Sequence, residues 1–185
     1  ESTVGKKESA EDFARTFSRY CDIATLRLFD HSMLEKIAKS ASIPIINAMT
    51  NAEHPCQILT DVFTYQETRG PLEGKVVTFV GDGACNVAAS WIFAAARLNF
   101  ELRIAAPKGF QPSAALLSRA NGKISCTEDL REAARGSDLL YTDVWVSMGK
   151  EAESTERIRQ LANYQINRAL VKLAKPDALV MHCLP

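Results

Sequence analysis

Several features are missing from this sequence of 185 residues, and each absence excludes a class of protein. There is no net charge, because 22 lysines and arginines balance 22 aspartates and glutamates, so neither nucleic acid nor an anionic membrane is expected as the main partner. Apolar runs are far shorter than the roughly 20 residues that a membrane-spanning helix needs. There is no N-terminal apolar signal segment and no CxxC pair, and the five cysteines are odd in number. We therefore expect a reduced, cytoplasmic protein.

Strand-like and helical segments alternate along the chain. In the first part, helical periodicity over 9–20, an apolar stretch at 23–29, a second helical stripe and another apolar stretch at 43–46 indicate a βαβ unit. Ser9 and Ser32 each stand three residues before an acidic residue, which is the spacing of a capping box. We expect both serines to begin helices.

The stretch 69–74 contains glycine and proline and breaks this pattern, so we expect a domain boundary there, with domains over 1–70 and 71–185. Beyond it, strands are expected at 75–80, 102–105, 124–126, 139–142 and 178–181. The helical segments between them, the first of them over 86–98, favour an open parallel sheet covered on both faces. The predicted fold class is α/β: two lobes, each a parallel sheet flanked by helices, the second doubly wound and Rossmann-like.

Polar side chains follow several of these strands, where ligands collect in sheets of this kind. One such turn, 81–86, begins Gly-Asp-Gly like a dinucleotide fingerprint, but Asn86 stands in place of the third glycine and no acidic residue ends the next strand. Nicotinamide or flavin binding is thus disfavoured. The turn either lets a helix approach the sheet or presents Asn86 to a ligand.

Histidine and cysteine occur close together twice, which raises the question of zinc. His54 and Cys56 flank a stiff proline, and His182 and Cys183 are adjacent at a strand end, where successive side chains diverge. This spacing argues against a metal site, so no metal is expected. Cys56 is expected to be a buried helical cysteine that packs as a small hydrophobe.

His54 precedes a proline at a favourable first helical position, and Gln57 follows in the first turn. The free N–H groups of a helix start make an electropositive end that suits an oxyanion or a carbonyl oxygen. Arg27 lies in an otherwise apolar strand, which is unusual without an anionic partner. For both residues an alternative stays open: a structural role for His54 and an internal salt bridge for Arg27.

Two further strand ends carry charged or reactive groups. Asp143 follows an apolar strand and, with Ser147, could bind an ammonium group, or the two could simply cap the loop. Cys183 follows the last strand and could supply a thiolate if nearby cations lower its pKa; otherwise it is an inert thiol.

Three strings in the sequence are specific: His-Pro-Cys-Gln-Ile-Leu-Thr-Asp at 54–61, Asp-Val-Trp-Val-Ser-Met-Gly at 143–149 and His-Cys-Leu-Pro at 182–185. On these strings, and in this order, the chain resembles the carbamoyltransferase family over essentially its whole length. The 143–149 string together with Cys183 points to the ornithine carbamoyltransferases rather than to the aspartate enzymes.

The resemblance implies transfer of a carbamoyl group from carbamoyl phosphate to the δ-amine of L-ornithine, giving L-citrulline and phosphate, with no metal or organic cofactor. It also implies a homotrimer or a multiple of trimers. The implied catalytic residues are Arg27, His54 and Cys183. Carbamoyl phosphate would be bound by Arg27, His54, Gln57, Cys183 and Leu184. Ornithine would be bound by Asn86, Asp143, Ser147 and Met148.

Members of this family carry a phosphate-gripping Ser-Thr-Arg-Thr segment upstream of Glu1, and a further arginine and a helix downstream of Pro185. We therefore expect an internal portion of an enzyme that does not turn over alone. Residues 2–7 resemble the family's loop that reaches into a neighbouring subunit, with Thr3 in place of a longer polar residue. The alternatives are a catalytically inactive carbamoyltransferase-like binding protein, a carbamoyltransferase for putrescine or N-acetylornithine, and a dinucleotide oxidoreductase.

Overall fold

The computed structural model describes residues 8–146 and 151–184. Its contacts divide the chain into two compact units, Glu1–Cys56 and Gln57–Pro185. This division falls near the start of helix α3 (Pro55–Arg69), because Ile58, Val62 and Tyr65 of that helix lie in the core of the second unit. The domain boundary expected at 69–74 stays a prediction.

Within the described ranges, every helix is too short or too polar to cross a membrane.

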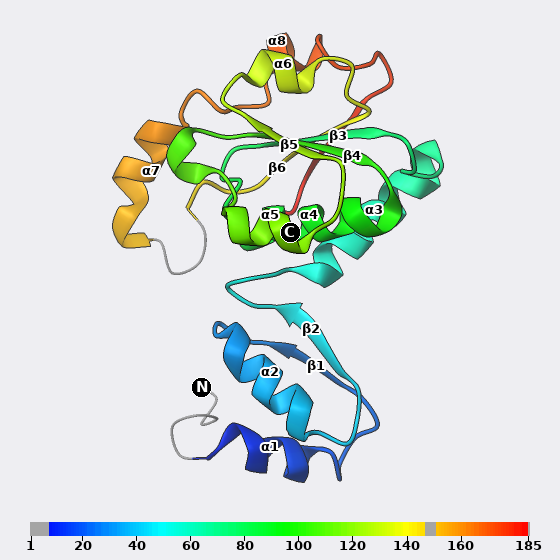
Figure 1. Cartoon of the computed structure of the whole chain (residues 1–185), viewed down its shortest axis with the longest axis vertical. Helices are drawn as coiled ribbons and strands as arrows, with labels where there is room; N and C mark the ends of the chain where they lie inside the picture. Colours follow the sequence, from blue (N-terminus) through cyan, green and yellow to red (C-terminus); the bar gives the residue numbers. More distant parts are fainter. Residues whose placement is uncertain (1–7, 147–150, 185) are drawn as a thin grey trace. The chain divides into compact units, whose positions relative to one another are not determined.

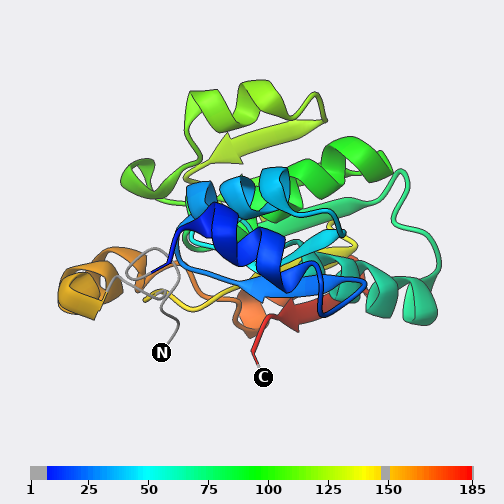
Figure 2. The ribbon, with the colours of Figure 1, turned by 90° about the horizontal axis from the view of Figure 1, so that it is seen from below.

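The first unit contains the predicted βαβ arrangement. Strand β1 (Ala24–Arg27), helix α2 (His31–Ser40) and strand β2 (Ile45–Met49) follow one another, and the two strands pair in parallel. Helix α1 (Ala10–Phe17) lies side by side with α2 (Figures 1 and 2). The buried apolar residues between these elements are Ala10, Ala14 and Ile37.

One of the two predicted helix caps is confirmed and the other is wrong. The Ser9 hydroxyl accepts the amide of Asp12 at 3.0 Å and caps α1 as expected. Helix α2 begins before Ser32, because the carboxylate of Asp30 accepts the amide of Ser32 at 2.8 Å and takes over the cap. A carboxylate at a helix N-terminus is also favoured by the helix dipole, and the hydrogen bonds from Ser32 lower the pKa of Asp30.

The second unit is built on a sheet of five parallel strands in the order β5-β4-β3-β6-β7, which confirms the predicted open parallel sheet. The strands are β3 (Val76–Val80), β4 (Glu101–Ala105), β5 (Ile124–Thr127), β6 (Leu139–Thr142) and β7 (Leu179–His182). The remaining helices are α4 (Asn86–Leu98), α5 (Ala114–Arg119), α6 (Leu130–Ala134), α7 (Ser154–Leu161) and α8 (Arg168–Val171). Short 3₁₀ turns cover Lys108–Phe110 and Glu151–Glu153.

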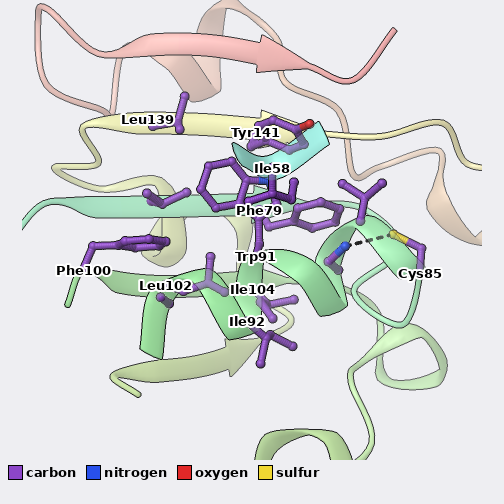
Figure 3. Close-up of a cluster of buried hydrophobic side chains, with 14 of the residues drawn as sticks. Ile58, Phe79, Cys85, Trp91, Ile92, Phe100, Leu102, Ile104, Leu139 and Tyr141 are labelled. Atoms are coloured by element: carbon purple, nitrogen blue, oxygen red, sulfur yellow. Dashed lines mark hydrogen bonds between the residues drawn. The ribbon is translucent and has the colours of Figure 1, made fainter. Parts of the chain in front are cut away.

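Helices cover both faces of this sheet, with α6 and α8 on one face and α3, α4 and α5 on the other (Figure 1). Successive side chains of a strand point to opposite faces, so Leu140 belongs to the smaller core cluster and Tyr141 to the larger one. In the larger cluster the rings of Trp91 and Tyr141 meet edge to face with centroids 5.0 Å apart, and Phe79 packs beside them (Figure 3).

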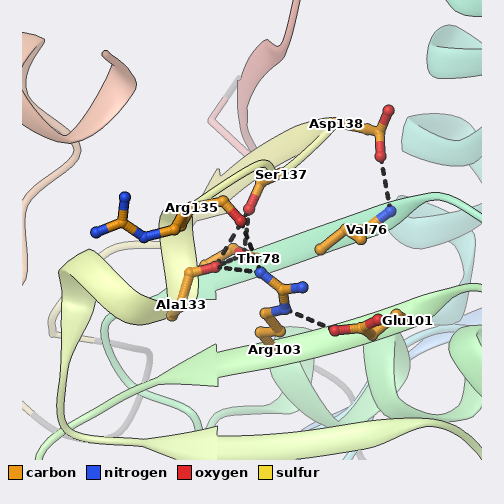
Figure 4. Close-up of polar contacts among 8 residues, drawn as sticks. All are labelled: Val76, Thr78, Glu101, Arg103, Ala133, Arg135, Ser137 and Asp138. Carbon is orange, nitrogen blue, oxygen red and sulfur yellow. Dashed lines mark hydrogen bonds and ion pairs between the residues drawn. The ribbon is translucent and has the colours of Figure 1, made fainter. Parts of the chain in front are cut away.

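Polar groups at the amino ends of the strands are already used for structure. The Asp138 carboxylate accepts the amide of Val76 at 2.9 Å, which joins the starts of β3 and β6 (Figure 4). It also accepts an N–H of Lys175 at 2.7 Å. Thr78 donates to the carbonyl of Ala133 at 2.8 Å and ties α6 to the sheet. The carboxyl ends of the strands are therefore the edge to inspect for a site.

Candidate functional site

The turn that follows β3 lies at the point where the strand order reverses. The chain passes from β3 to β4 on one side and later places β6 and β7 on the other. Val80 pairs with Thr142, and Thr142 pairs with His182. Gly81, Asp143 and Cys183 each come one residue later, so three of the predicted strand ends meet at one edge of the sheet, as expected for a parallel sheet.

Asp143 is 9% exposed and is surrounded by hydrogen-bond donors. Its Oδ1 atom accepts the amide of Val144 at 2.6 Å and the thiol of Cys183 at 2.8 Å. Its Oδ2 atom lies 3.7 Å from the thiol of Cys85. One carboxylate thus receives hydrogen bonds from two cysteines, which come from two other turns at this edge.

The environment keeps both thiols protonated. Burial, the hydrogen bond to Asp143 and the nearby charge of Asp61 raise the pKa of Cys183 to about 12. Burial also raises the pKa of Cys85, with Asp143 as the next cause. The condition under which Cys183 was expected to supply a thiolate, namely nearby cations that lower its pKa, is therefore not met, because the charged neighbours that act on it are carboxylates.

The glycine turn after β3 brings helix α4 close to the sheet. A Cβ atom on Gly83 would lie 2.5 Å from Cγ2 of Ile104 and 3.0 Å from the carbonyl oxygen of Phe110, so any other residue would force its neighbours to shift. Cys85 then caps α4, its sulfur accepting the amide of Ala88 at 3.4 Å. Asn86 is the first residue of α4 and is partly exposed, which places it at the carboxyl edge of the sheet.

Arg157 of α7 is a residue of this region that the sequence analysis missed. Its side chain is 9% exposed and forms an ion pair with Asp82, which is 7% exposed. It also donates from Nε to the carbonyl of Trp145 at 2.9 Å and lies over the ring of Phe110 at 4.9 Å. Arg157 therefore fixes the turn after β3 to the segment after β6. Nothing in the sequence distinguishes it from the exposed charges of the same helix.

A second buried network reaches this region from α3. Asp61 accepts a hydrogen bond from the Tyr141 hydroxyl at 2.6 Å, and a second one from Nε2 of Gln57 at 3.1 Å. Burial and the bond to Asp61 raise the pKa of Tyr141 far above its usual range. Gln57 was expected at the site, but its link to Tyr141 through Asp61 was not.

The expectation that the side chains of His182 and Cys183 diverge is wrong. Asp143, His182 and Cys183 each place one ligand atom within 4.8 Å of the others. Adjacent side chains at a strand end diverge only while the strand continues, and the chain leaves the strand after His182. Three potential ligands of this kind fit a small cation such as zinc. The family resemblance, in contrast, implies chemistry without a metal.

In the first unit, Arg27 is the last residue of β1 and its side chain is exposed. The internal salt bridge considered for it is not seen, since no ion pair links it to another residue in the part of the chain that the structure describes. His54 stands directly before α3, which begins at Pro55 as predicted. Cys56 is only half-buried, and its thiol donates to the carbonyl of Asn47 at 3.3 Å, so the expected buried packing role is wrong.

The loop that carries His54 is fixed by a buried threonine. The Thr50 hydroxyl oxygen accepts the amides of Ala52 at 3.3 Å and Glu53 at 3.2 Å. Nδ1 of His31 lies 2.9 Å from the same oxygen. These contacts define the backbone path into the residue before α3.

Four more of the expected residues are either exposed or outside the residues that the structure describes. Leu184 follows Cys183 and is 64% exposed. Ser147, Met148 and Thr3 lie outside the described residues.

Two family models match the chain almost from end to end. The model for the carbamoyl-P binding domain of aspartate/ornithine carbamoyltransferase matches residues 1–67, and the model for the Asp/Orn binding domain matches residues 73–185. The chain belongs to the aspartate/ornithine carbamoyltransferase family. This membership agrees with the α/β fold and with a polar cluster at the carboxyl edge of the second sheet.

Relatives within this family carry the name ornithine carbamoyltransferase. The proteins of Nitrosococcus oceani and Psychrobacter arcticus are 46% and 47% identical over 185 residues, which is 100% of this chain and 60% of each of those proteins. The solved enzyme of Pyrococcus furiosus superposes with a TM-score of 0.89 at 39% identity, covering 98% of this chain and 60% of that one. The anabolic enzyme of Campylobacter jejuni gives 0.91 at 33% identity, covering 100% and 63%. The chain thus spans about 60% of the length of its curated relatives.

Proposed function

We propose that the protein transfers the carbamoyl group of carbamoyl phosphate to the δ-amine of L-ornithine and forms L-citrulline and phosphate. Family membership and the printed names of the relatives support this activity. The observation that carries the proposal is the contact between Asp143 and Cys183, because a buried carboxylate beside a neutral thiol is suited to hold an amino acid by its ammonium group.

We assign the binding of the electrophile, carbamoyl phosphate, to cationic and neutral hydrogen-bond donors. Arg27 and His54 polarise the carbonyl oxygen of carbamoyl phosphate, whose negative charge grows in the tetrahedral transition state. A donor aimed at such an oxyanion typically contributes about 3 kcal/mol. Gln57 and the Leu184 carbonyl hold the carbamoyl amide group, and Asn86, Ser147 and the Met148 backbone hold the amino-acid end of ornithine.

The nucleophile must be a neutral amine, whereas a lysine-like amine has a reference pKa of about 10.4 and is charged at neutral pH. Removal from water favours the neutral form. In the protein, Asp143 anchors the α-ammonium group of ornithine. That ammonium offsets the negative charge that raises the pKa of Cys183, so substrate binding makes this thiol easier to ionise beside the δ-amine.

We also propose domain limits, an assembly and a cellular location. We assign 1–70 to the carbamoyl phosphate-binding domain and 71–185 to the ornithine-binding domain, close to the limits of the two matching models. We also propose assembly as a homotrimer or a multiple of trimers and a location in the cytoplasm.

The test is citrulline formation by the protein as its gene encodes it. L-Ornithine, putrescine and N-acetylornithine are each supplied with carbamoyl phosphate at equal concentrations, and a reaction without carbamoyl phosphate gives the background. We expect the highest rate with L-ornithine. A preference for either of the other amines overturns the substrate assignment, and absence of product with all three overturns the activity.

A further inference from the structure

The amide group of Gln57 is held in one orientation. Its Nε2 atom donates to Oδ1 of Asp61 at 3.1 Å. A carboxylate only accepts hydrogen bonds, so the Gln57 amide must turn its NH₂ group toward Asp61. The carbonyl oxygen of the same amide then points in the other direction. Within the described residues, that carbonyl oxygen has no hydrogen-bond donor. One N–H of this group is used by Asp61, so the carbonyl oxygen is the part of the amide that is turned away from Asp61 and can accept a hydrogen bond from a ligand.

Asp61 is itself fixed by the core. Its second oxygen accepts the Tyr141 hydroxyl at 2.6 Å, and Asp61 is 4% exposed. Tyr141 is fully buried on β6, where its ring packs against Trp91 and Phe79 (Figure 3). The ring contacts hold the Tyr141 hydroxyl in place, and its hydrogen bond holds the Asp61 carboxylate beside Gln57.

A purely structural role is a poor account of this network. Burial of a carboxylate costs free energy even when it is hydrogen-bonded, and an apolar pair of similar volume is often at least as stable. Asp61 and Tyr141 lie among apolar residues of the larger core cluster, where such a pair would pack well. The network also lies near the candidate site, since Tyr141 is two residues before Asp143 and the charge of Asp61 acts on Cys183.

We propose that Asp61 and Tyr141 are positioning residues that turn the carbonyl oxygen of Gln57 toward the ligand, and that this selects a ligand with an NH₂ group beside its carbonyl over one with a methyl group there. The inference rests on the proposed function, which places Gln57 at the carbamoyl group. A carbamoyl NH₂ donates to the Gln57 oxygen, whereas a methyl group leaves that oxygen without a donor in a partly closed site. An unrestrained amide would be free to turn its NH₂ group to the ligand and would lose this discrimination.

The test compares two stable phosphonates that differ only at this position. Phosphonoacetamide carries an NH₂ group beside its carbonyl, and acetonylphosphonate carries a methyl group. Dissociation constants are measured by titration calorimetry with the protein as its gene encodes it. We expect preference for the amide by about tenfold, the value of one good hydrogen bond. In Asp61→Asn the new amide can donate or accept, Gln57 can turn, and the preference is expected to fall to about twofold or less.

Further variants separate orientation from folding. Tyr141→Phe removes one hydroxyl without changing the shape of the core and is expected to reduce the preference partly. Tyr65→Phe is the matched control, because it removes another buried tyrosine hydroxyl that makes no hydrogen bond with Asp61 or Gln57, and it is expected to leave the preference unchanged. The double variant Gln57→Glu with Asp61→Asn restores an acceptor at position 57, so the preference returns although added negative charge weakens the binding of both phosphonates.

The ratio of the two dissociation constants decides the outcome. Equal weakening of both phosphonates in Asp61→Asn and Tyr141→Phe, with the ratio preserved, assigns these residues a structural role and overturns the inference. If the unsubstituted protein forms citrulline but the ratio of the dissociation constants is the same in all variants, the inference fails and the proposed function stands. If it binds neither phosphonate and forms no citrulline, the proposed function fails with it. Should Asp61→Asn not fold, Tyr141→Phe carries the comparison, and an unchanged ratio in that variant overturns the inference.

Discussion

The thiol of Cys183 donates a hydrogen bond to Oδ1 of Asp143, with 2.8 Å between sulfur and oxygen. The two residues follow neighbouring strands and lie next to each other because Thr142 and His182 pair in the sheet. Burial is the first cause and Asp143 the second that raise the pKa of this thiol to about 12, from an ordinary 9.0. The ligand-free protein therefore keeps Cys183 protonated through the neutral range.

We predict that Cys183 reacts slowly with iodoacetamide at pH 8 and that Asp143→Asn accelerates the reaction. The thiolate is the reactive form, and removal of the carboxylate lowers the pKa of the thiol although burial still raises it. A fall of one pKa unit corresponds to an acceleration of about tenfold. Timed quenching and mass spectrometry of the peptide that contains Cys183 measure the rate, which rises with pH in both proteins.

Cys21 is an internal reference for this experiment, because it is a partly exposed thiol that belongs to the first unit, and its rate is expected to be the same in the two proteins. Equal rates at Cys183 in the two proteins would refute the electrostatic role of Asp143.

The raised pKa of Cys183 also makes the free energy of unfolding depend on pH. Because the pKa is higher in the folded state than in the unfolded chain, the contribution of the neutral thiol is complete below pH 9.0 and is lost as the pH rises toward about 12.

Arg157→Met is predicted to destabilise the protein by about 3–5 kcal/mol, because it leaves the buried carboxylate of Asp82 without its ion-pair partner. Asp82→Asn leaves the guanidinium buried and is expected to destabilise as well. The double variant should lose less than the sum of the two single changes, since neither charge is then left alone. Urea unfolding of the four proteins gives the coupling free energy.

Arg159→Met is the matched control for this cycle. Arg159 lies on the same helix and pairs with Glu156, but both side chains are exposed. Exposed pairs contribute little, so no measurable loss of stability is expected. Strict additivity of the Arg157 and Asp82 substitutions would contradict the assignment of a coupled buried pair.

Gly83→Ala is predicted to destabilise the protein by about 1–3 kcal/mol, the usual cost of overpacking a tight site. The added Cβ would meet Ile104 at 2.5 Å and the backbone of Phe110 at 3.0 Å. Gly109→Ala provides the comparison, because nothing lies within 4 Å of a Cβ at that position. Thermal unfolding should separate the two variants clearly, and equal melting temperatures would show that the turn relaxes to admit a side chain.

Much of the fold was predictable from hydrophobic periodicity. Helix α4 (Asn86–Leu98) and strand β6 (Leu139–Thr142) were predicted to the residue, because their apolar patterns end at clear polar or turn residues. The cap at Ser32 was predicted wrongly, since the Ser-x-x-Glu pattern took no account of the carboxylate of Asp30 two residues earlier. Local competition between capping groups is thus harder to predict than the presence of the helix.

The site was predictable only in part. The rule that ligands collect at the carboxyl ends of parallel strands brought Asp143 and Cys183 together correctly. The sequence does not distinguish Arg157 from the other charged residues of its helix, or Tyr141 from other aromatic residues in apolar segments. Their partners, Asp82 and Asp61, are 75 and 80 residues away in the chain, so only tertiary packing reveals the contacts.

His54→Ala is predicted to lower kcat for citrulline formation by about 10²–10³-fold while changing the KM for carbamoyl phosphate little. The reason is that an oxyanion donor strengthens its contact as charge develops, so its loss acts on the transition state more than on the bound substrate. Steady-state citrulline assays on the protein as its gene encodes it, with carbamoyl phosphate varied at saturating L-ornithine, separate the two constants.

Two nearby substitutions test whether the N–H donor of His54 is the group that matters. His54→Gln keeps an N–H donor at the start of α3 and is expected to recover part of kcat. Cys56→Ser changes the neighbouring side chain, whose partner is the carbonyl of Asn47, and is expected to leave kcat nearly unchanged because a serine hydroxyl can make the same bond. If His54→Ala altered KM alone, His54 would bind the ground state and the transition state equally, and the stabilisation of the oxyanion would have to come from Arg27 without it.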